Sequence, residues 1–305
     1  MGASVTPAEL PSGIVVRPAR DLEMRAARLL LPSAFISGAP ETLVALSGAG
    51  IVLGAAAIGW VHALSRPSEP ACFPLLVHVV PAARRQGVGR ALVGAAAALC
   101  HGEADGIRTW SPIALGSEAA VFLDVVGFAP HRRMLFFETD GAAFHAMVER
   151  LRVGLQRAGR ITAGSRIAGL HEAPAKGVAS LLAGDFPAPA TEILRRLQRT
   201  EPDSFDLDRS VALFVGEELA GGLLYSWNDG LPAIDALAVA PAFRGTAAVV
   251  LLLEAATRNG LEGGATRFRF SCDDDNRDTV NLARRCAAET IRVDAEYRLL
   301  FPRPG

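Results

Sequence analysis

The pattern of apolar and polar positions predicts an alternation of strands and helices, and the same order occurs twice along the chain. Apolar runs of strand length lie at residues 14–17, 75–80, 107–111 and 134–138. Apolar residues at helical spacing cover 22–31, 88–100 and 117–126. The second half repeats this order from Ile167 to Phe301. The pattern therefore predicts an α/β chain (an α+β arrangement) built from two similar domains.

Residues 43–64 carry no Asp, Glu, Lys or Arg and are long enough to span a bilayer. A turn of small residues at 47–50 divides them into two apolar segments, which is typical of a β-hairpin. We expect a buried hairpin here and no membrane partner.

Individual residues recur at fixed spacings in the two halves. The matched positions are Val44-Ala45-Leu46 with Val211-Ala212-Leu213, Trp60 with Trp227, Pro81 with Pro241, and Arg84 with Arg244. The spacing falls from 167 to 160 between the tryptophan and the proline, so the first copy has a longer loop there. We predict domains at residues 1–141 and 161–305, joined by a connecting helix and linker at 142–160.

Composition narrows the range of functions. The formal net charge is −1, whereas a general nucleic-acid-binding protein would have a basic face or stripe. The four cysteines show no C-x-x-C spacing, which gives no indication of a metal site or a disulfide framework and suits a reducing cytoplasm. The run Asp273-Asp274-Asp275-Asn276 lacks calcium-loop spacing, so we interpret it as a solvated loop that caps a helix.

The segment LLVHVVPAARRQGVGRALVGAAAALC, residues 75–100, holds the clearest candidate site. A β-branched strand ends at Pro81, a turn with Gly87 and Gly89 follows, and an alanine-rich helix begins directly afterwards. Backbone amides of a glycine turn can approach a phosphate closely, and the helix N-terminus behind them carries roughly half a positive charge. The turn matches neither Walker A nor the Rossmann pattern. It therefore predicts another kind of anion site.

The sequence R-x-x-G-x-G after V-x-P resembles the coenzyme A pyrophosphate loop of the GNAT superfamily of N-acyltransferases. The pair Gly127-Phe128 after a short helix also fits this family. The resemblance implies two tandem GNAT-like domains, each with a mixed, mostly antiparallel twisted sheet flanked by helices. It also implies acetyl-CoA as co-substrate, bound by Val79, Arg84, Arg85, Gln86, Gly87, Val88, Gly89 and Arg90.

The second copy departs from the family loop. Its sequence is RGTAAV, with Ala247 and Val249 in place of the two glycines. A Cβ branch at Val249 would project toward the pyrophosphate and stiffen the turn. We therefore expect the first domain to bind the coenzyme and the second to bind it weakly or not at all.

The resemblance also implies a catalytic arrangement that neither copy keeps in full. The tyrosine position of the family holds Leu123 and Ala283, and the usual carboxylate position holds Leu75 in the first copy and Asp235 in the second. His78 is the candidate base of the first domain because histidine titrates near neutrality. A hydrogen-bonded core histidine is the alternative for His78. Asp235 is the corresponding candidate of the second domain, and a polar residue at a strand edge is its alternative.

Three functions remain open on the sequence. The first is transfer of an acetyl or short acyl group from acyl-CoA to a primary amine of a small-molecule or peptide acceptor. The second is a non-catalytic acyl-CoA-binding or sensing protein, since the usual acid and base are missing. The third is a scaffold of two degenerate GNAT halves without coenzyme affinity.

Overall fold

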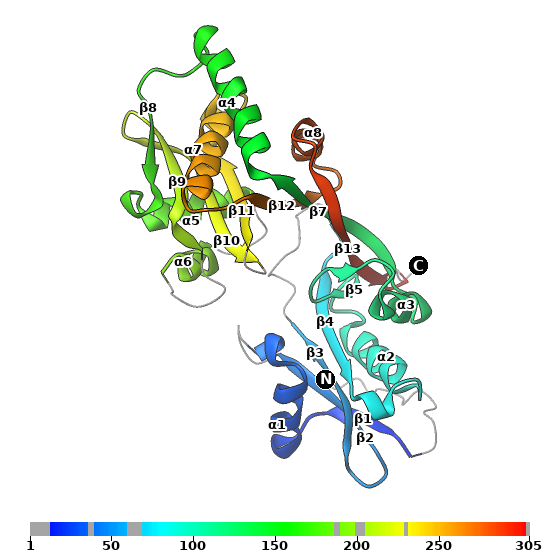
Figure 1. Ribbon diagram of the computed structural model, residues 1–305. Coiled ribbons are helices and arrows are strands. Elements are labelled where there is room, and N and C mark those ends of the chain that lie inside the picture. Colours follow the sequence, from blue (N-terminus) through cyan, green and yellow to red (C-terminus); the bar gives the residue numbers. More distant parts are fainter. Residues whose placement is uncertain are drawn as a thin grey trace. The chain divides into compact units, whose positions relative to one another are not determined.

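The computed structural model describes residues 13–35, 40–59, 69–185, 190–198, 205–228 and 231–302. These residues form two compact units (Figure 1). Unit 1 comprises Met1–Arg133 together with Asp294–Gly305, and unit 2 comprises Met134–Val293.

Unit 1 follows the element order expected from the sequence. It contains β1 (Val15–Pro18), α1 (Asp21–Leu30), η1 (Pro32–Phe35), β2 (Glu41–Leu46), β3 (Val52–Ile58), β4 (Cys72–Val79), η3 (Pro81–Ala83), α2 (Val88–Cys100), β5 (Gly106–Thr109), β6 (Ile113–Ala114) and α3 (Glu118–Val125). β2 and β3 pair in antiparallel fashion, which confirms the hairpin over the described part of residues 43–64. Trp60 lies outside the described residues.

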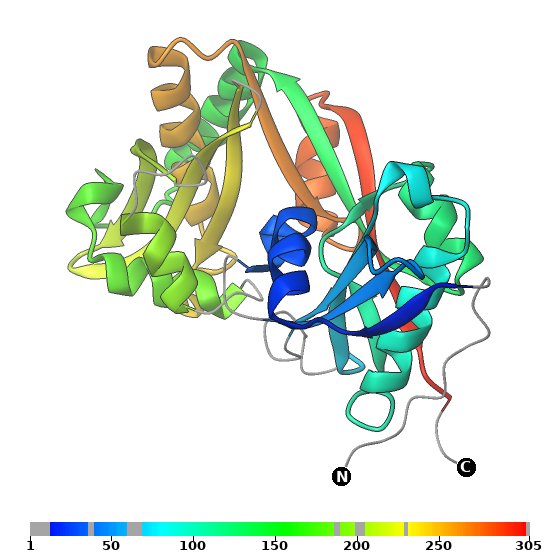
Figure 2. The ribbon, with the colours of Figure 1, turned by 90° about the horizontal axis from the view of Figure 1, so that it is seen from below.

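The sheet of unit 1 has the strand order β1-β2-β3-β4-β5-β13, with β6 paired to β13. Within the part of the chain that the structure describes, β4 and β5 run parallel, whereas β1–β2, β2–β3, β3–β4, β5–β13 and β6–β13 run antiparallel. One sheet face packs against α2 through a core that includes Leu75, Leu92 and Ile107. The other face packs against α1 through Ala27 and Ala55. The two helices therefore cover opposite faces (Figure 2).

Unit 2 has a similar order of strands and helices. It contains α4 (Gly141–Arg157), β8 (Ser165–Gly169), η4 (Leu170–Glu172), α5 (Ala175–Asp185), α6 (Ala190–Gln198), β9 (Asp206–Val215), β10 (Glu218–Asn228), β11 (Leu231–Val239), η5 (Pro241–Phe243), α7 (Ala248–Glu262), β12 (Arg267–Asp273) and α8 (Arg277–Arg285). Its strand order is β8-β9-β10-β11-β12-β7.

The last strand of each copy joins the other unit. β7 (Ala129–Asp140) pairs with β12 of unit 2 from Met134 onward, and β13 (Glu289–Leu300) pairs with β5 of unit 1 through Arg298–Leu300. The units thus differ from the predicted domains 1–141 and 161–305, which left each of these strands in its own copy. Each strand has 12 residues and mixes apolar with charged side chains, so the sequence pattern alone does not fix which sheet each strand completes.

Residues 142–160 were expected to connect the domains, but α4 is part of the core of unit 2. Phe144 and Val148 on α4 are fully buried in the cluster that contains Leu252 of α7. Burying two large apolar side chains contributes about 2 kcal/mol each. The helix therefore belongs to unit 2.

Candidate functional site

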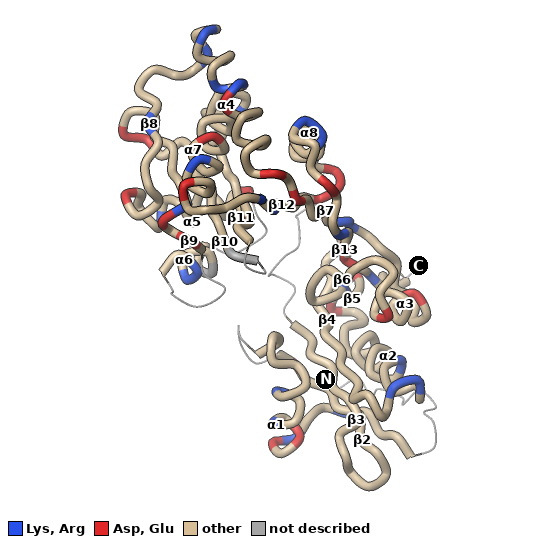
Figure 3. The backbone as a smooth tube through the Cα atoms, in the orientation of Figure 1, with Lys and Arg blue, Asp and Glu red and all other residues tan. Residues whose placement is uncertain are grey.

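The α2 loop, residues 84–87, connects β4 and η3 to α2 and is braced by its own side chains. The Nε of Arg84 donates to the carbonyl oxygen of Val79 at 3.2 Å, and the Nε2 of Gln86 donates to the carbonyl oxygen of Ala82 at 2.9 Å. Residues 84–87 are exposed to solvent. The positively charged segment before α2 is visible in Figure 3.

The backbone of the α2 loop turns through the left-handed region twice. Arg85 has a φ of 63° and Gly87 has a φ of 82°. The first intrahelical hydrogen bond of α2 runs from the amide of Ala91 to the carbonyl of Gly87 at 3.0 Å. The amides of the three preceding residues therefore point out of the helix end. A left-handed residue followed by free amides is a nest, the kind of concavity that binds anions.

Helix packing, and not only the approach of a phosphate, explains why residue 89 is glycine. A Cβ at this position would lie 3.0 Å from the ring of Phe122 on α3. The close approach of α2 and α3 therefore favours glycine even without a ligand. The sequence interpretation, which attributed Gly89 to the coenzyme alone, missed this packing role.

The corresponding loop of unit 2 has the same arginine hydrogen bond but does not form the nest. Arg244 donates from Nε to the carbonyl oxygen of Val239 at 3.1 Å, as Arg84 does in unit 1. Ala247 has a right-handed backbone, with φ −69° and ψ −3°. The amide of Ala248 donates to the Oγ1 of Thr246 at 3.3 Å, so the chain itself occupies an amide that is free in unit 1.

β4 separates from β5 beside the α2 loop. In the described part of the chain, their pairing ends at Leu75 and Thr109. The amide of Val80 donates to Leu53 of β3 at 3.0 Å, so strand alternation turns the amides of Val77 and Val79 away from β3 and toward the gap. These are donors that could stabilise a developing oxyanion.

His78 lies near the end of β4, opposite Ala55 in the β3 register, and is half-buried. Its side chain is on the face that packs against α1, as are those of Leu76 and Trp110. The structure thus places His78 and α2 on opposite faces of the sheet, with the β4–β5 gap between them.

Asp235 lies in unit 2, on β11, and has a partner. Its Oδ2 accepts a hydrogen bond from Nη2 of Arg196 on α6 at 3.0 Å. The guanidinium of Arg196 also stacks on Phe205, 4.0 Å from the ring centroid. The β10–β11 register shifts at this point, pairing Leu224 with Ala236 but Tyr225 with Ile234. Asp235 is therefore the extra residue of a β-bulge.

The tyrosine positions hold Leu123 and Ala283, both buried. Of the chain's two tyrosines, Tyr297 belongs to unit 1 through β13. Its amide donates to the Oγ1 of Thr109 at 3.2 Å, beside the end of the β4–β5 pairing. Burial raises the pKa of Tyr297, with a further contribution from Asp124. Sequence reasoning missed this residue because it assigned β13 to the second domain.

A groove of about 390 Å³ adjoins the start of α2. It lies between α2 and the end of α3 and is lined by Arg90, Val93, Gly94, Ala97, Val126 and Gly127, among others. Its walls are mainly apolar, with one arginine at the helix start. The groove could accommodate an organic portion of a ligand whose anionic group lies at the nest.

The acidic run before α8 caps the helix. The Oδ1 of Asn276 accepts a hydrogen bond from the amide of Thr279 at 3.1 Å, which confirms the N-cap interpretation. Among the described residues, no group of three or more His, Cys, Asp or Glu side chains could hold a metal ion. None of the described helices has the length and apolar character to cross a bilayer.

Residues 176–288 match the model of the Acetyltransferase (GNAT) family, from α5 to the residue before β13. Unit 2 therefore contains a GNAT acetyltransferase domain. The first copy lies outside this match. Family similarity thus identifies the copy whose loop lacks the nest, whereas the loop geometry favours the other copy. No curated protein sequence matches the chain significantly.

Solved structures similar to the chain have the same fold. A GCN5-related N-acetyltransferase from Sphaerobacter thermophilus is 16% identical over 97% of this chain and 98% of that chain, with a TM-score of 0.55. A tandem GNAT protein from the clavulanic acid biosynthesis pathway is 18% identical over 95% and 100%, with a TM-score of 0.55. A conserved protein of unknown function from Enterococcus faecalis V583 is 11% identical over 95% and 72%, with a TM-score of 0.67. The chain has the GNAT fold.

Proposed function

We propose that this protein is an N-acyltransferase that moves an acetyl or other short acyl group from acyl-CoA to a primary amine. In this proposal the α2 loop of unit 1 binds the diphosphate of the coenzyme. The observation that carries it is the nest, in which left-handed Gly87 precedes three amides outside the helix hydrogen bonds. Arg84, Arg85 and Arg90 add positive charge around it. The GNAT domain in unit 2 supports the same chemistry.

The β4–β5 gap supplies groups for the transfer. Acyl-CoA provides a thioester, which is reactive toward amines. His78 would accept a proton from the attacking amine, and the amides of Val77 or Val79 would stabilise the charge on the carbonyl oxygen. A C–N bond forms, the C–S bond breaks, and the thiolate leaves. The thiolate is a fair leaving group because the ordinary pKa of a thiol is near 8.5. Water or the Tyr297 hydroxyl can then protonate the released thiolate.

Calorimetry with acetyl-CoA tests the binding step. Alanine in the left-handed region costs roughly 1–2 kcal/mol, so Gly87→Ala should distort the nest and weaken binding at least about tenfold. Gly102→Ala is the matched control, because Gly102 has a φ of 92°, lies in unit 1 and has open space around it. Unchanged affinity in Gly87→Ala would remove the coenzyme from this loop.

Unit 2 provides a second comparison. Thr246→Ala removes the hydroxyl that occupies the Ala248 amide, but Ala247 stays right-handed. We expect acetyl-CoA binding to remain at one site per chain in this variant. A second binding site in this variant would show that the Thr246 hydroxyl alone blocks the loop of unit 2, and unchanged binding in Gly87→Ala would point to unit 2 as the coenzyme site.

Turnover separates the enzyme from a sensor. Release of free coenzyme A over a panel of amines should be detectable in the wild type and should fall in His78→Ala without loss of acetyl-CoA affinity. The sensor is the second candidate because neither Leu75 nor Leu123 can transfer a proton. Tight binding with no turnover on any amine would favour it.

A further inference from the structure

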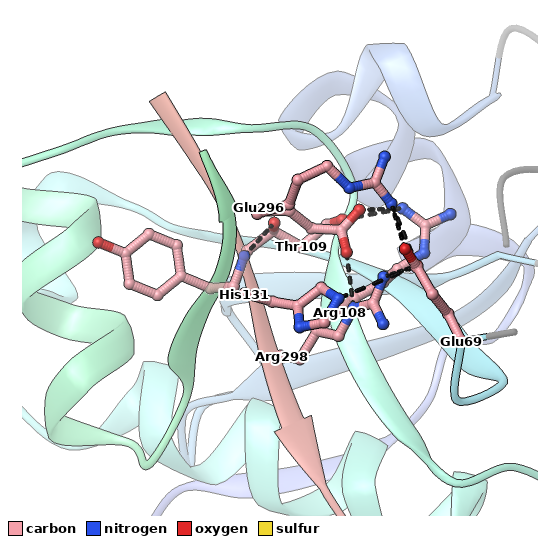
Figure 4. A network of polar contacts seen from close by, with 8 residues as sticks. Glu69, Arg108, Thr109, His131, Glu296 and Arg298 are labelled. Carbon is pink, nitrogen blue, oxygen red and sulfur yellow. Dashed lines mark hydrogen bonds and ion pairs between the residues drawn. The ribbon is translucent and has the colours of Figure 1, made fainter. Parts of the chain in front are cut away.

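Unit 1 contains a buried group of charged residues outside the α2 loop. The arginine cluster consists of Arg108 on β5, Arg298 on β13 and Arg132 on β7, and two glutamates, Glu69 and Glu296, accompany it (Figure 4). Arg108 is 2% exposed and Arg298 is 5% exposed. Three arginines accompany two carboxylates in this group. Figure 4 also shows His131 at its margin, 4.0 Å from Glu69.

The two glutamates are fully engaged by other members of the group. Glu69 accepts hydrogen bonds from Arg298 and Arg132, and Glu296 accepts one from Nε of Arg298 at 2.7 Å. Burial opposes ionisation of Glu69, but these arginines outweigh it and lower the pKa of Glu69. Glu69 therefore remains charged, and the two glutamates serve mainly Arg298 and Arg132.

Arg108 is left with an unused edge. Its Nη1 lies 3.4 Å from the carbonyl oxygen of Thr109 and 3.6 Å from Oε2 of Glu296. Its Nε and Nη2 are buried and have no hydrogen-bond partner in the described structure. A buried donor without a partner costs about 1–3 kcal/mol, and more when charged. Nε and Nη2 form the side of the guanidinium whose parallel N–H groups match the two oxygens of a carboxylate.

Unit 2 shows the same edge in use. Arg269 on β12 donates from Nε to Glu138 at 2.8 Å, and Arg267 contacts the same carboxylate through its Nε at 2.7 Å. The chain thus supplies a carboxylate to the Nε edge in unit 2. Arg108 has the same kind of edge, deeply buried, without such a carboxylate.

The position of Arg108 connects it to the β4–β5 gap. It pairs with Pro74 on β4, one residue before the pairing of the two strands ends. Its side chain shares the sheet face with Trp110, two residues later on β5, and with His78 on β4. The side chain of Arg108 therefore lies on the face opposite α2, and its backbone is next to the end of the β4–β5 pairing, where the gap that the proposed function uses for acyl transfer begins.

We propose that Arg108 binds a carboxylate of the acceptor, so that the acceptor is an amino acid or a similarly small amine bearing a carboxylate. This inference rests on the proposed function for the acyl transfer. Carboxylate binding itself needs only unit 1 and no coenzyme. Arg108 is then a specificity-determining residue, and the amine of the bound acceptor lies toward the gap between β4 and β5.

Matched acceptors test the inference. Amino acids, their carboxamides and the corresponding decarboxylated amines should be compared for coenzyme A release. We expect kcat/KM for the acids to exceed that for the amides by about 100-fold, because charge-assisted bidentate hydrogen bonds contribute about 3 kcal/mol. Equal rates for acids and amides would overturn the assignment.

Variants show whether Arg108 reads the carboxylate. Arg108→Gln should lose the preference for acids, so that its kcat/KM values for acids and amides become equal. Arg108→Lys keeps the positive charge but lacks the two parallel N–H groups, so it should lose part of the preference for acids. Arg133→Gln, an exposed arginine of the same unit, is the control for lost charge. A preference that survives in Arg108→Gln would contradict the proposal.

A measurement without coenzyme separates this inference from the proposed function. Amino acids at millimolar concentration should raise the melting temperature of the wild type, and the carboxamides should not. Arg108→Gln should show no such increase, and its acetyl-CoA affinity checks that unit 1 is folded. No amino acid effect in a protein that binds acetyl-CoA would refute the carboxylate site. An effect without acetyl-CoA binding would instead refute the acyltransferase.

Discussion

The two copies end their last helix in the same motif with different residues, which allows a reciprocal test of backbone strain. After α3, Gly127 has a φ of 91°, and after α8 the same position is Ala287 with a φ of 51°. In both, the amide of the next residue bonds back five residues, from Phe128 to Leu123 at 3.0 Å and from Ala288 to Ala283 at 2.9 Å. This is the Schellman motif, which favours glycine at the left-handed position.

Ala287→Gly should stabilise the protein. An L-residue in the left-handed region costs roughly 1–2 kcal/mol, and glycine adds about 0.5–1 kcal/mol of entropy to the unfolded chain. Ala287 is exposed, so loss of its methyl group removes little buried area. The net gain is about 0.5–1 kcal/mol, which is a rise of roughly 1–4 °C in melting temperature for a unit of about 150 residues.

Gly127→Ala should destabilise by a similar amount. A Cβ at this position would lie 3.5 Å from Cδ1 of Leu299, an ordinary van der Waals distance. The cost is therefore the backbone conformation alone, about 1 kcal/mol. Urea unfolding followed by far-UV circular dichroism measures both variants, provided that the dependence on urea concentration stays unchanged.

Ala158→Gly is the control for the loss of a methyl group near a helix end. Ala158 is exposed and has a right-handed φ of −80° after α4. Glycine relieves no strain there, so this variant should be less stable by about 0.5–1 kcal/mol. If Ala287→Gly were destabilising to the same extent as Ala158→Gly, the strain assigned to Ala287 would be refuted.

Three further predictions concern charge and thiols. Glu69→Gln should destabilise unit 1 by about 3 kcal/mol at pH 7, because a buried arginine pair loses its counter-charge. Since the pKa of Glu69 is lowered in the folded protein, its contribution is fully present above the unfolded value near 4.3 and is lost as the pH falls through the lowered folded value. The difference in urea unfolding between wild type and variant should therefore shrink as the pH is lowered below the unfolded value. Asp235→Asn should change the stability by less than about 1 kcal/mol in the same assay, because its pair with Arg196 is partly exposed, and a larger loss would show that the bulge depends on it. Burial raises the pKa of Cys100 to about 12 and that of Cys272 to about 11. The thiols of the folded protein should therefore react slowly with Ellman's reagent at pH 8, whereas all four cysteines should react after denaturation. Rapid reaction of the native protein would contradict the burial of these cysteines.

Local sequence determined the elements and the candidate loop. Apolar periodicity predicted α2 at residues 88–100, and the structure has it at Val88–Cys100. The repeat predicted that Arg84 and Arg244 are equivalent, and both donate from Nε to the carbonyl five residues earlier. These features depend on residues that are close in sequence, so the spacing of apolar residues and the turn preferences of individual residues are enough to predict them.

Tertiary structure decided which strands pair and which polar groups find partners. β7 and β13 both mix apolar with charged residues, and backbone hydrogen bonding does not depend on side-chain identity, so the sequence could not assign β13 to unit 1. That assignment brings Arg298 beside Arg108 and Tyr297 beside Thr109. The unused edge of Arg108 likewise depends on residues from distant segments, because burial and hydrogen-bond partners are properties of the assembled fold.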